Sequence, residues 1–300
     1  MNVRNNGIYM GLIVSGVMQL SCGFDNSSYN ARFQPFTDNF YNATGYQLLE
    51  PSQTYFLPDI LNEISGLSTL NDSVLACVQD ESGVIFMYGL NEKGIIDRHR
   101  FAGAGDFEGI QIIGEQAFVL KSNGEIYRYN LRTDKTKVFE TPLKRKNNAE
   151  GLGFDPDNNR LLIACKGRPG LGSNDLNGRA VYSYHLTQGF DPEILYLITP
   201  EDLESWNQAQ PEPLNLTQRQ KNFMPSGIAV HPFTSEVYLL ANVGKLLIVL
   251  TPEGEIKYCV PLSPRIFRQP EGICFTSKGD LIISNEGQDG SGKILVFAKD

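Results

Sequence analysis

Three glutamates occupy the same place in a repeated triplet, and their type and spacing point most directly to chemistry. Glu108, Glu150 and Glu271 are each followed by glycine and then by an aliphatic residue. Ser65 and Ser226 hold the same place in two further copies of the triplet. Carboxylates that converge on one axis repel each other unless a divalent cation, bound water or a facing lysine compensates.

Two interpretations of the glutamates are open. Carboxylate oxygens suit a hard cation, so the first is a Ca²⁺ site with Glu108, Glu150 and Glu271 as metal ligands. The second is structural, with the glutamates satisfying backbone amides of neighbouring strands while lysines balance their charge. Further polar residues are predicted to reach the same face, and the ligand-binding candidates are Asp80, Glu108, Lys121, Glu150, Lys166, Asn242, Glu271, Asn285 and Glu286.

The triplet is part of a longer repeat of short apolar runs bounded by turn residues. Its glycine recurs at intervals of 43, 42, 76 and 45 residues, at Gly66, Gly109, Gly151, Gly227 and Gly272. Short strands that repeat every 40–50 residues or so are typical of a β-propeller, with one four-stranded blade per repeat. The sequence therefore predicts an all-β protein with a single β-propeller of five blades.

The long interval predicts an insertion at about 199–221, which begins as a helix. Thr199 is a suitable cap, and Pro200 suits the first helical turn. A degenerate sixth blade within this stretch is an alternative. If Trp206 marks a platform for a protein partner, the stretch should instead expose an apolar patch.

The last repeat supplies only three strands before the chain stops at Asp300. A ring with an unpaired strand edge would invite aggregation, so we expect an N-terminal strand to complete the final blade. The candidates are residues 46–49 and 54–57, and the propeller domain is predicted to span 46–300.

The first residues are typical of an export signal. An apolar run, too short to span a bilayer comfortably, follows Arg4 and ends at Leu20-Ser21-Cys22. This pattern resembles a bacterial lipoprotein signal over 1–21, with a lipid-bearing Cys22 and a tether over 22–45. Gln19 departs from the usual pattern, and an ordinary secretory signal with an incidental Cys22 is the alternative. We expect a membrane-anchored protein of the bacterial cell envelope, either periplasmic or exposed at the surface.

Composition narrows the class of partner. The net charge is −8 and no basic run exceeds Lys144-Arg145-Lys146, which disfavours nucleic acid. None of the three histidines falls in the predicted ring, so a Ser-His-Asp arrangement is unsupported. Four cysteines besides Cys22 lie in predicted strands and are expected to be buried hydrophobes. We expect a monomer.

The repeats that contain Glu150 and Glu271 resemble the SdiA-regulated (YjiK-like) β-propeller family. The likeness rests on Glu150-Gly151-Leu152 before 159–164 and on Pro270-Glu271-Gly272-Ile273 before 279–286, and it extends over roughly 57–297. It implies an exported or membrane-anchored bacterial propeller, of which lipoprotein forms are common in Bacteroidetes-type bacteria, with a calcium ion at most. Glu108, Glu150 and Glu271 match its acidic positions, whereas Ser65 and Ser226 do not and lower the ligand count.

The expected function is therefore an envelope-anchored module that binds a small ligand or an envelope protein, with Ca²⁺ at the channel mouth. The alternative is a metal-dependent hydrolase of a lactone or phosphoester, since the family is related in fold to propeller phytases and gluconolactonase-like enzymes. In that case Glu150 and Glu271 would bind the metal, Asn242 and Asn285 would assist, and Lys121 or Lys166 would hold the substrate. Shared fold does not transfer activity.

Overall fold

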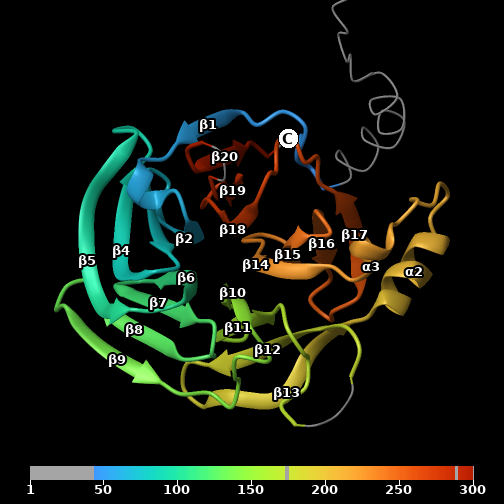
Figure 1. Cartoon of the computed structure of the whole chain (residues 1–300), viewed down its shortest axis with the longest axis horizontal. Helices are drawn as coiled ribbons and strands as arrows, with labels where there is room; N and C mark the ends of the chain where they lie inside the picture. Colours follow the sequence, from blue (N-terminus) through green and yellow to red (C-terminus); the bar gives the residue numbers. More distant parts are fainter. Residues whose placement is uncertain (1–43, 173–175, 288–289, 300) are drawn as a thin grey trace, which may run out of the picture. The chain divides into compact units, whose positions relative to one another are not determined.

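The computed structural model describes residues 44–172, 176–287 and 290–299, and these form five four-stranded antiparallel sheets around a central axis (Figure 1). We number these sheets blades 1 to 5 in chain order. Blade 1 contains β2 (Ile64–Asn71), β3 (Val74–Gln79), β4 (Ser82–Gly89) and β5 (Gly94–Ala104). Blade 2 contains β6 (Phe107–Ile113), β7 (Gln116–Lys121), β8 (Ile126–Asn130) and β9 (Lys135–Phe139). Blades 3 and 4 contain β10 (Ala149–Asp155), β11 (Arg160–Cys165), β12 (Arg179–His185) and β13 (Gly189–Ile198), then β14 (Met224–Val230), β15 (Val237–Val243), β16 (Leu246–Leu250) and β17 (Ile256–Pro261).

Blade 5 joins the two ends of the described chain. Its strands β18 (Pro270–Phe275), β19 (Leu281–Asn285) and β20 (Lys293–Phe297) are completed by β1 (Gln53–Phe56), which pairs antiparallel with β20. Tyr46 adds an isolated bridge to Lys299, and its hydroxyl donates to the Gly279 carbonyl at 2.6 Å. The predicted closure of the ring by an N-terminal strand is confirmed, and 54–57 was the better of the two candidates.

Most apolar side chains pack between neighbouring blades. One cluster joins blades 4 and 5 with Tyr46 and Leu48, and the other clusters of the described residues fill the remaining blade interfaces. Cys77, Cys165, Cys259 and Cys274 are buried within these layers as free thiols. A strand with apolar residues on both faces is what this arrangement requires.

The repeated glycine is explained by close contact between the first strands of adjacent blades. A Cβ on Gly66 would lie 2.9 Å from the Glu108 carbonyl oxygen. A Cβ on Gly151 would lie 2.9 Å from the backbone of Gly227. The same contact recurs around the described ring and returns from Gly272 to the Leu67 backbone at 2.9 Å. Any side chain here would push two blades apart.

The insertion folds as two short helices, α2 (Pro200–Gln208) and α3 (Gln218–Lys221), beside β17 (Figure 1). Thr199 caps α2 with a capping box, and Pro200 opens the helix as predicted. Leu203, Leu214 and Leu216 are buried against the core between blades 3 and 4, with Trp206 packed against the same cluster. Residues 199–221 therefore contain neither a sixth blade nor the exposed apolar patch expected of a docking platform, because their apolar side chains cover a blade interface.

The next observations concern the predicted signal sequence, Cys22 and tether at the N-terminus. Among the described residues, no helix has the length and apolar character needed to cross a membrane. The predicted signal sequence, Cys22 and nearly all of the predicted tether lie outside the described residues. A short 3₁₀ helix, η1 (Asp59–Leu61), links β1 to the first blade.

Candidate functional site

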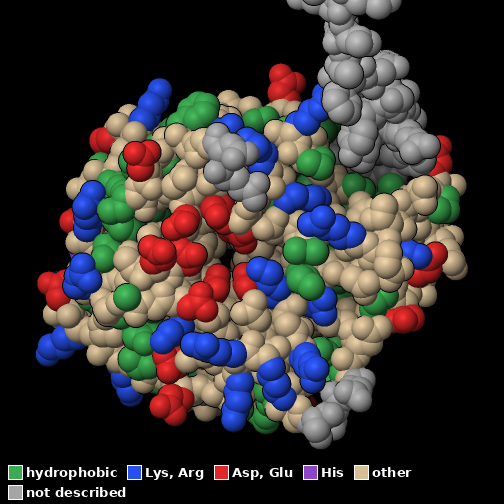
Figure 2. Space-filling model, in the orientation of Figure 1, with side chains coloured by type: hydrophobic (Ala, Val, Ile, Leu, Met, Phe, Trp, Pro, Cys, Tyr) green, Lys and Arg blue, Asp and Glu red, His purple; other side chains and the backbone are tan. Residues whose placement is uncertain are grey.

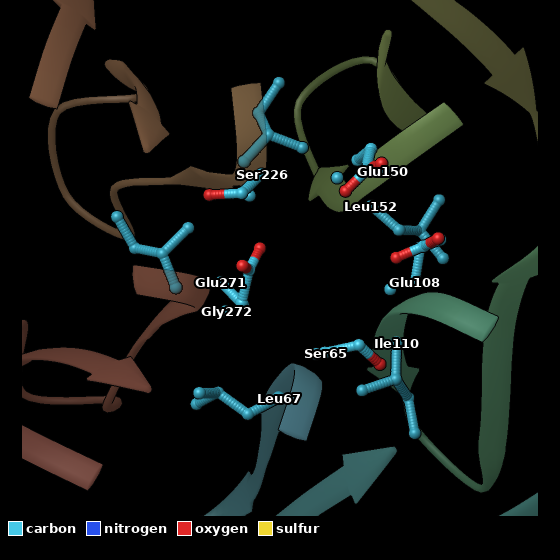
Figure 3. A pocket seen from close by; sticks show the side chains of 15 residues that line it. Ser65, Leu67, Glu108, Ile110, Glu150, Leu152, Ser226, Glu271 and Gly272 are labelled. Atoms are coloured by element: carbon cyan, nitrogen blue, oxygen red, sulfur yellow. The ribbon is translucent and has the colours of Figure 1, made fainter. Parts of the chain in front are cut away.

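A β-bulge at the start of each first strand aims one side chain at the axis. In blade 1 the pairing steps from Ile64↔Gln79 to Gly66↔Val78 and leaves Ser65 without a partner residue. The same shift occurs around Glu108, Glu150, Ser226 and Glu271. Bulges re-aim side chains in this way, so the repeated triplet places one polar residue per blade at the channel. Figure 3 shows these side chains converging on the axis.

Four of these side chains, all but Ser226, line a hollow of about 180 Å³, which we call the axial cavity. The residues that line it are Glu63, Ser65, Asp80, Glu108, Glu150, Lys166, Gln269, Glu271 and Glu286. This described lining holds six carboxyl groups and one lysine. Figure 2 shows acidic side chains gathered on one side of the central opening and Lys and Arg side chains on the other.

Aliphatic side chains close the floor of the axial cavity. They belong to the third residue of each triplet, namely Leu67, Ile110, Leu152, Ile228 and Ile273. The space left among the polar, glycine and aliphatic rings is about 10 Å³. That is room for no more than about one water molecule. The glutamates thus sit on an apolar floor, which weakens the hydration of their charged forms.

Burial and mutual repulsion shift the glutamates toward their protonated forms. The pKa of Glu108 rises to about 9, mainly because the side chain is buried and also because Glu150 and Asp106 lie nearby. Burial likewise raises the pKa of Glu271 to about 8, although Lys166 opposes the shift. In the absence of a bound cation, these two carboxyl groups therefore hold protons at neutral pH and can donate hydrogen bonds.

Lys166 and Glu150 form the ion pair at the centre of the site. The Lys166 Nζ lies 3.2 Å from Glu150 Oε1, and Asn148 Nδ2 donates to the same oxygen at 2.6 Å. Burial opposes the charge on Lys166, but Glu150, Glu271 and Glu108 together raise its pKa. Burial still raises the pKa of Glu150 despite its partner. The ammonium therefore partly neutralises the glutamates from within the cavity.

Glu271 is also tied to blade 4 through a chain of polar groups. Asn242 Nδ2 donates to Glu271 Oε1 at 2.7 Å, and Lys245 Nζ donates to Asn242 Oδ1 at 2.5 Å and to the Arg268 carbonyl at 2.7 Å. Burial lowers the pKa of Lys245 to about 8, and the nearby Arg219 acts in the same direction. Lys245 has a positive φ of 50°, in the turn between β15 and β16.

The outer edge of the axial cavity is acidic as well. Burial and the proximity of Glu63 raise the pKa of Asp80, whose Oδ1 is buried without a hydrogen-bond partner. Burial and repulsion from Asp80 also raise the pKa of Glu286. Gln269 Nε2 donates to the Glu286 carboxylate. The site therefore extends from the axis toward blades 1 and 5.

The serines in the ring have a structural role instead. Ser65 Oγ donates to the Phe107 carbonyl of the next blade at 2.7 Å, and Ser226 Oγ donates to the Pro270 carbonyl at 2.7 Å. An ionised carboxylate cannot donate such a bond. Serine thus links neighbouring blades where the ring has no glutamate.

The structure brings together most of the predicted candidates, with two exceptions. Lys121 does not line the axial cavity, because its ammonium pairs with Glu125 Oε2 at 3.5 Å in the following hairpin. Asn285 lies one residue from the site but lines a different cavity. Asp80, Lys166 and Glu286 line the axial cavity as predicted, and Asn242 contacts it through Glu271.

Sequence reasoning missed Glu63 and Gln269 as lining residues. Each stands two positions before the triplet's polar residue, as do Asp106, Asn148 and Met224 in the other copies. This position could have been found from the repeat, because residues two apart on an extended strand point the same way. Asp106 lies near enough to Glu108 and Glu150 to raise the pKa of each, and Asn148 donates to Glu150.

The donor set does not amount to a ready-made metal site. Among the described residues, no group of three or more His, Cys, Asp and Glu side chains is placed to hold a metal ion. Oxygen donors are of the right chemical type for Ca²⁺, yet an ammonium already lies within the cluster. Calcium therefore stays a prediction.

Comparisons with known proteins show the fold. No family model matches the chain, and no curated protein matches it. A glutaminyl cyclase structure from Myxococcus xanthus is 11% identical, with 83% of this chain and 95% of that chain covered and a TM-score of 0.55. A nidogen–laminin complex is 19% identical, with 74% of this chain and 72% of that chain covered and a TM-score of 0.47. A streptogramin B lyase is 15% identical, with 81% of this chain and 68% of that chain covered and a TM-score of 0.43.

These identities are too low to carry an activity. The chain is a five-bladed β-propeller, a fold that serves both binding proteins and enzymes. What it does must be argued from the axial cavity.

Proposed function

We propose that the protein is an envelope-anchored binding module that takes a cation into the axial cavity. The observation that carries this proposal is the lining itself, six carboxyl groups with one lysine around about 180 Å³. Glu108 and Glu271 are protonated at neutral pH because they are buried beside other acids. A cation would replace those protons and relieve the repulsion, so the cavity favours positive charge.

Positive charge is the shared chemistry of two possible ligands. Ca²⁺ is the first, since it prefers carboxylate and amide oxygens, and it would be held by Glu108, Glu150 and Glu271. Lys166 would have to withdraw from Glu150 for the ion to reach them. An organic ammonium is the second, and it needs no cage of three close ligands.

Calorimetry on the full chain in mild detergent, after removal of metals with a chelator, tests the proposal. We would titrate CaCl₂ and, separately, 1,4-diaminobutane at neutral pH, in two buffers with different ionisation enthalpies. We expect saturable binding of at least one cation with release of protons, because Glu108 and Glu271 must ionise. Glu150→Gln and Glu271→Gln should weaken binding about tenfold or more, whereas the exposed Glu193→Gln should not.

The lysine that competes with Ca²⁺ supplies a further test. Lys166→Met removes the competing ammonium and should strengthen Ca²⁺ binding, because the ion no longer displaces it. If neither cation binds the wild-type chain, or if both glutamine variants bind unchanged, the proposal is wrong. The glutamates would then serve only to hold neighbouring blades together.

The anchor and the family are proposals that rest on the sequence. Lipidation of Cys22 predicts that a radioactive fatty acid labels the wild-type chain in bacteria and does not label Cys22→Ser. Membership of the SdiA-regulated (YjiK-like) family is supported by the repeated Glu-Gly-aliphatic triplet. We expect the anchored protein to face the periplasm or the cell exterior.

Hydrolysis is the second candidate, and one observation favours it. Glu108 holds a proton while Glu150 is paired with Lys166, so two neighbouring carboxyl groups experience different environments. Such a difference is what separates a general acid from a base or a metal ligand. A screen of lactones and phosphoesters with added Ca²⁺ tests this, and any turnover that persists in Glu150→Gln would count against it.

A further inference from the structure

A second hollow lies beside the axial cavity, and we call it the rim cavity. It measures about 240 Å³ and lies between the start of β20, the end of β19, the end of β1 and the loop before β18. Glu286 lines both cavities. The two cavities are therefore neighbours that share this side chain.

The rim cavity contains a buried polar atom that the protein leaves unpaired. Asn285 is 3% exposed, and its Oδ1 has no hydrogen-bond partner, while its Nδ2 donates to the Ile266 carbonyl at 3.3 Å. A buried acceptor without a partner lowers the stability of the fold. A ligand N–H or O–H at this position would satisfy it, so Asn285 points to a bound partner independently of the acidic residues.

The charge of the rim cavity is opposite to that of the axial cavity. Arg268 and Lys293 line it, and Lys293 Nζ lies 5.2 Å from the centre of the Phe56 ring. Ile266 and Phe56 add apolar side chains to its lining, and Glu286 adds one carboxyl group. Together the two hollows therefore offer acidic, apolar and basic side chains to a ligand.

We propose that the two cavities take one amphoteric ligand, an ω-amino acid or a short peptide with a free amino terminus. Its ammonium enters the axial cavity, its apolar part lies on Ile266 and Phe56, and its carboxylate reaches Arg268 and Lys293. Where the ligand is a peptide, one of its amide N–H groups pairs with Asn285 Oδ1. The cationic end rests on the proposed function, whereas the anionic end rests on the rim cavity alone.

Calorimetry with a homologous series tests the proposal on the full chain in detergent. The series runs from β-alanine to ε-aminocaproate, each compared with the n-alkylamine and the fatty acid of the same length. At the best length, we expect the amino acid to bind about tenfold more tightly than the alkylamine, because its carboxylate adds a charge-assisted hydrogen bond. Affinity should peak at one length, since two fixed sites set the span.

Variants separate the two ends of the ligand. Arg268→Gln with Lys293→Gln should reduce amino-acid affinity to that of the alkylamine and leave the alkylamine unchanged. Asn285→Ala should weaken binding of a short peptide, whose amide N–H it accepts, and circular dichroism should confirm that each variant is folded. Glu271→Gln should weaken both ligands together.

The outcomes are distinguishable. Equal affinity for the amino acid and the alkylamine, at every length, overturns the rim subsite and leaves the cation site intact. Binding of Ca²⁺ without any amine also overturns this ligand class while keeping the proposed function. Failure of every cation overturns both.

Discussion

Replacement of Glu271 by glutamine should make the protein more stable in mild alkali. Glu271 is 9% exposed, and burial raises its pKa from 4.5 to about 8. The folded chain therefore binds this proton more tightly than the unfolded chain does. Stability from this group is full below about pH 4.5 and is lost as the pH rises toward 8.

The magnitude follows from the shift. A rise in pKa from 4.5 to about 8 corresponds to roughly 5 kcal/mol if it is fully expressed. Lys166 and Glu150 adjust as Glu271 ionises, so we expect about half, or ~2 kcal/mol. Glutamine resembles the protonated carboxyl, and its amide oxygen can keep the hydrogen bond from Asn242 Nδ2.

Urea unfolding at about pH 5 and about pH 8.5, without added cations, measures the effect. Wild type and Glu271→Gln should have similar free energies of unfolding at the lower pH, and the variant should be about 2 kcal/mol more stable at the higher pH. Glu193→Gln, on the exposed outer strand β13, should follow the wild type. Parallel pH profiles for wild type and Glu271→Gln would refute the reasoning, since they would mean that Glu271 is already ionised at low cost.

Three further predictions concern the ring. Gly151→Ala should destabilise the fold by about 2 kcal/mol or more in urea unfolding, because its Cβ would lie 2.9 Å from the backbone of the next blade. Gly172→Ala is the control: its Cβ would meet open space, so the free energy of unfolding should change by less than about 0.5 kcal/mol. Tyr46→Phe should cost about 1–2 kcal/mol in the same assay, because the buried Gly279 carbonyl loses its donor; an unchanged midpoint would contradict this. Deletion of residues 44–57 should expose the edge of β20 and cause self-association in size-exclusion chromatography, and a monomeric, fully folded product would show that β1 is dispensable.

The propeller could be predicted because its repeat depends on short-range signals. Gly66 and its four equivalents are required by contact between blades, so their spacing reports the blade count directly. The helix α2 was likewise visible, since Thr199 and Pro200 act within a single turn. The predicted closing strand followed from counting strands, because an incomplete blade has an unpaired edge.

The site could be predicted only in part, because side-chain direction depends on neighbours that the sequence does not place. Lys121 and Lys166 follow equivalent strands, yet a nearby Glu125 pairs with Lys121 while Glu150 pairs with Lys166. Lys245 gave no signal, because its approach to Asn242 depends on a left-handed turn conformation. The rim cavity needed the structure altogether, since it combines residues from β1 and from the far end of the chain.

At the bulge before each glycine, packing between blades and presentation of a side chain at the axis fall to two different residues. The glycine fixes the distance between blades, while the bulged residue beside it projects toward the axis. Each blade thus has one position at the axis whose side chain can be substituted while the glycine contacts between blades are kept. Five such positions surround one axis, and in this chain they are occupied, in chain order, by Ser, Glu, Glu, Ser and Glu. Substitutions at these positions, one at a time, could therefore change which ligand the axial cavity binds.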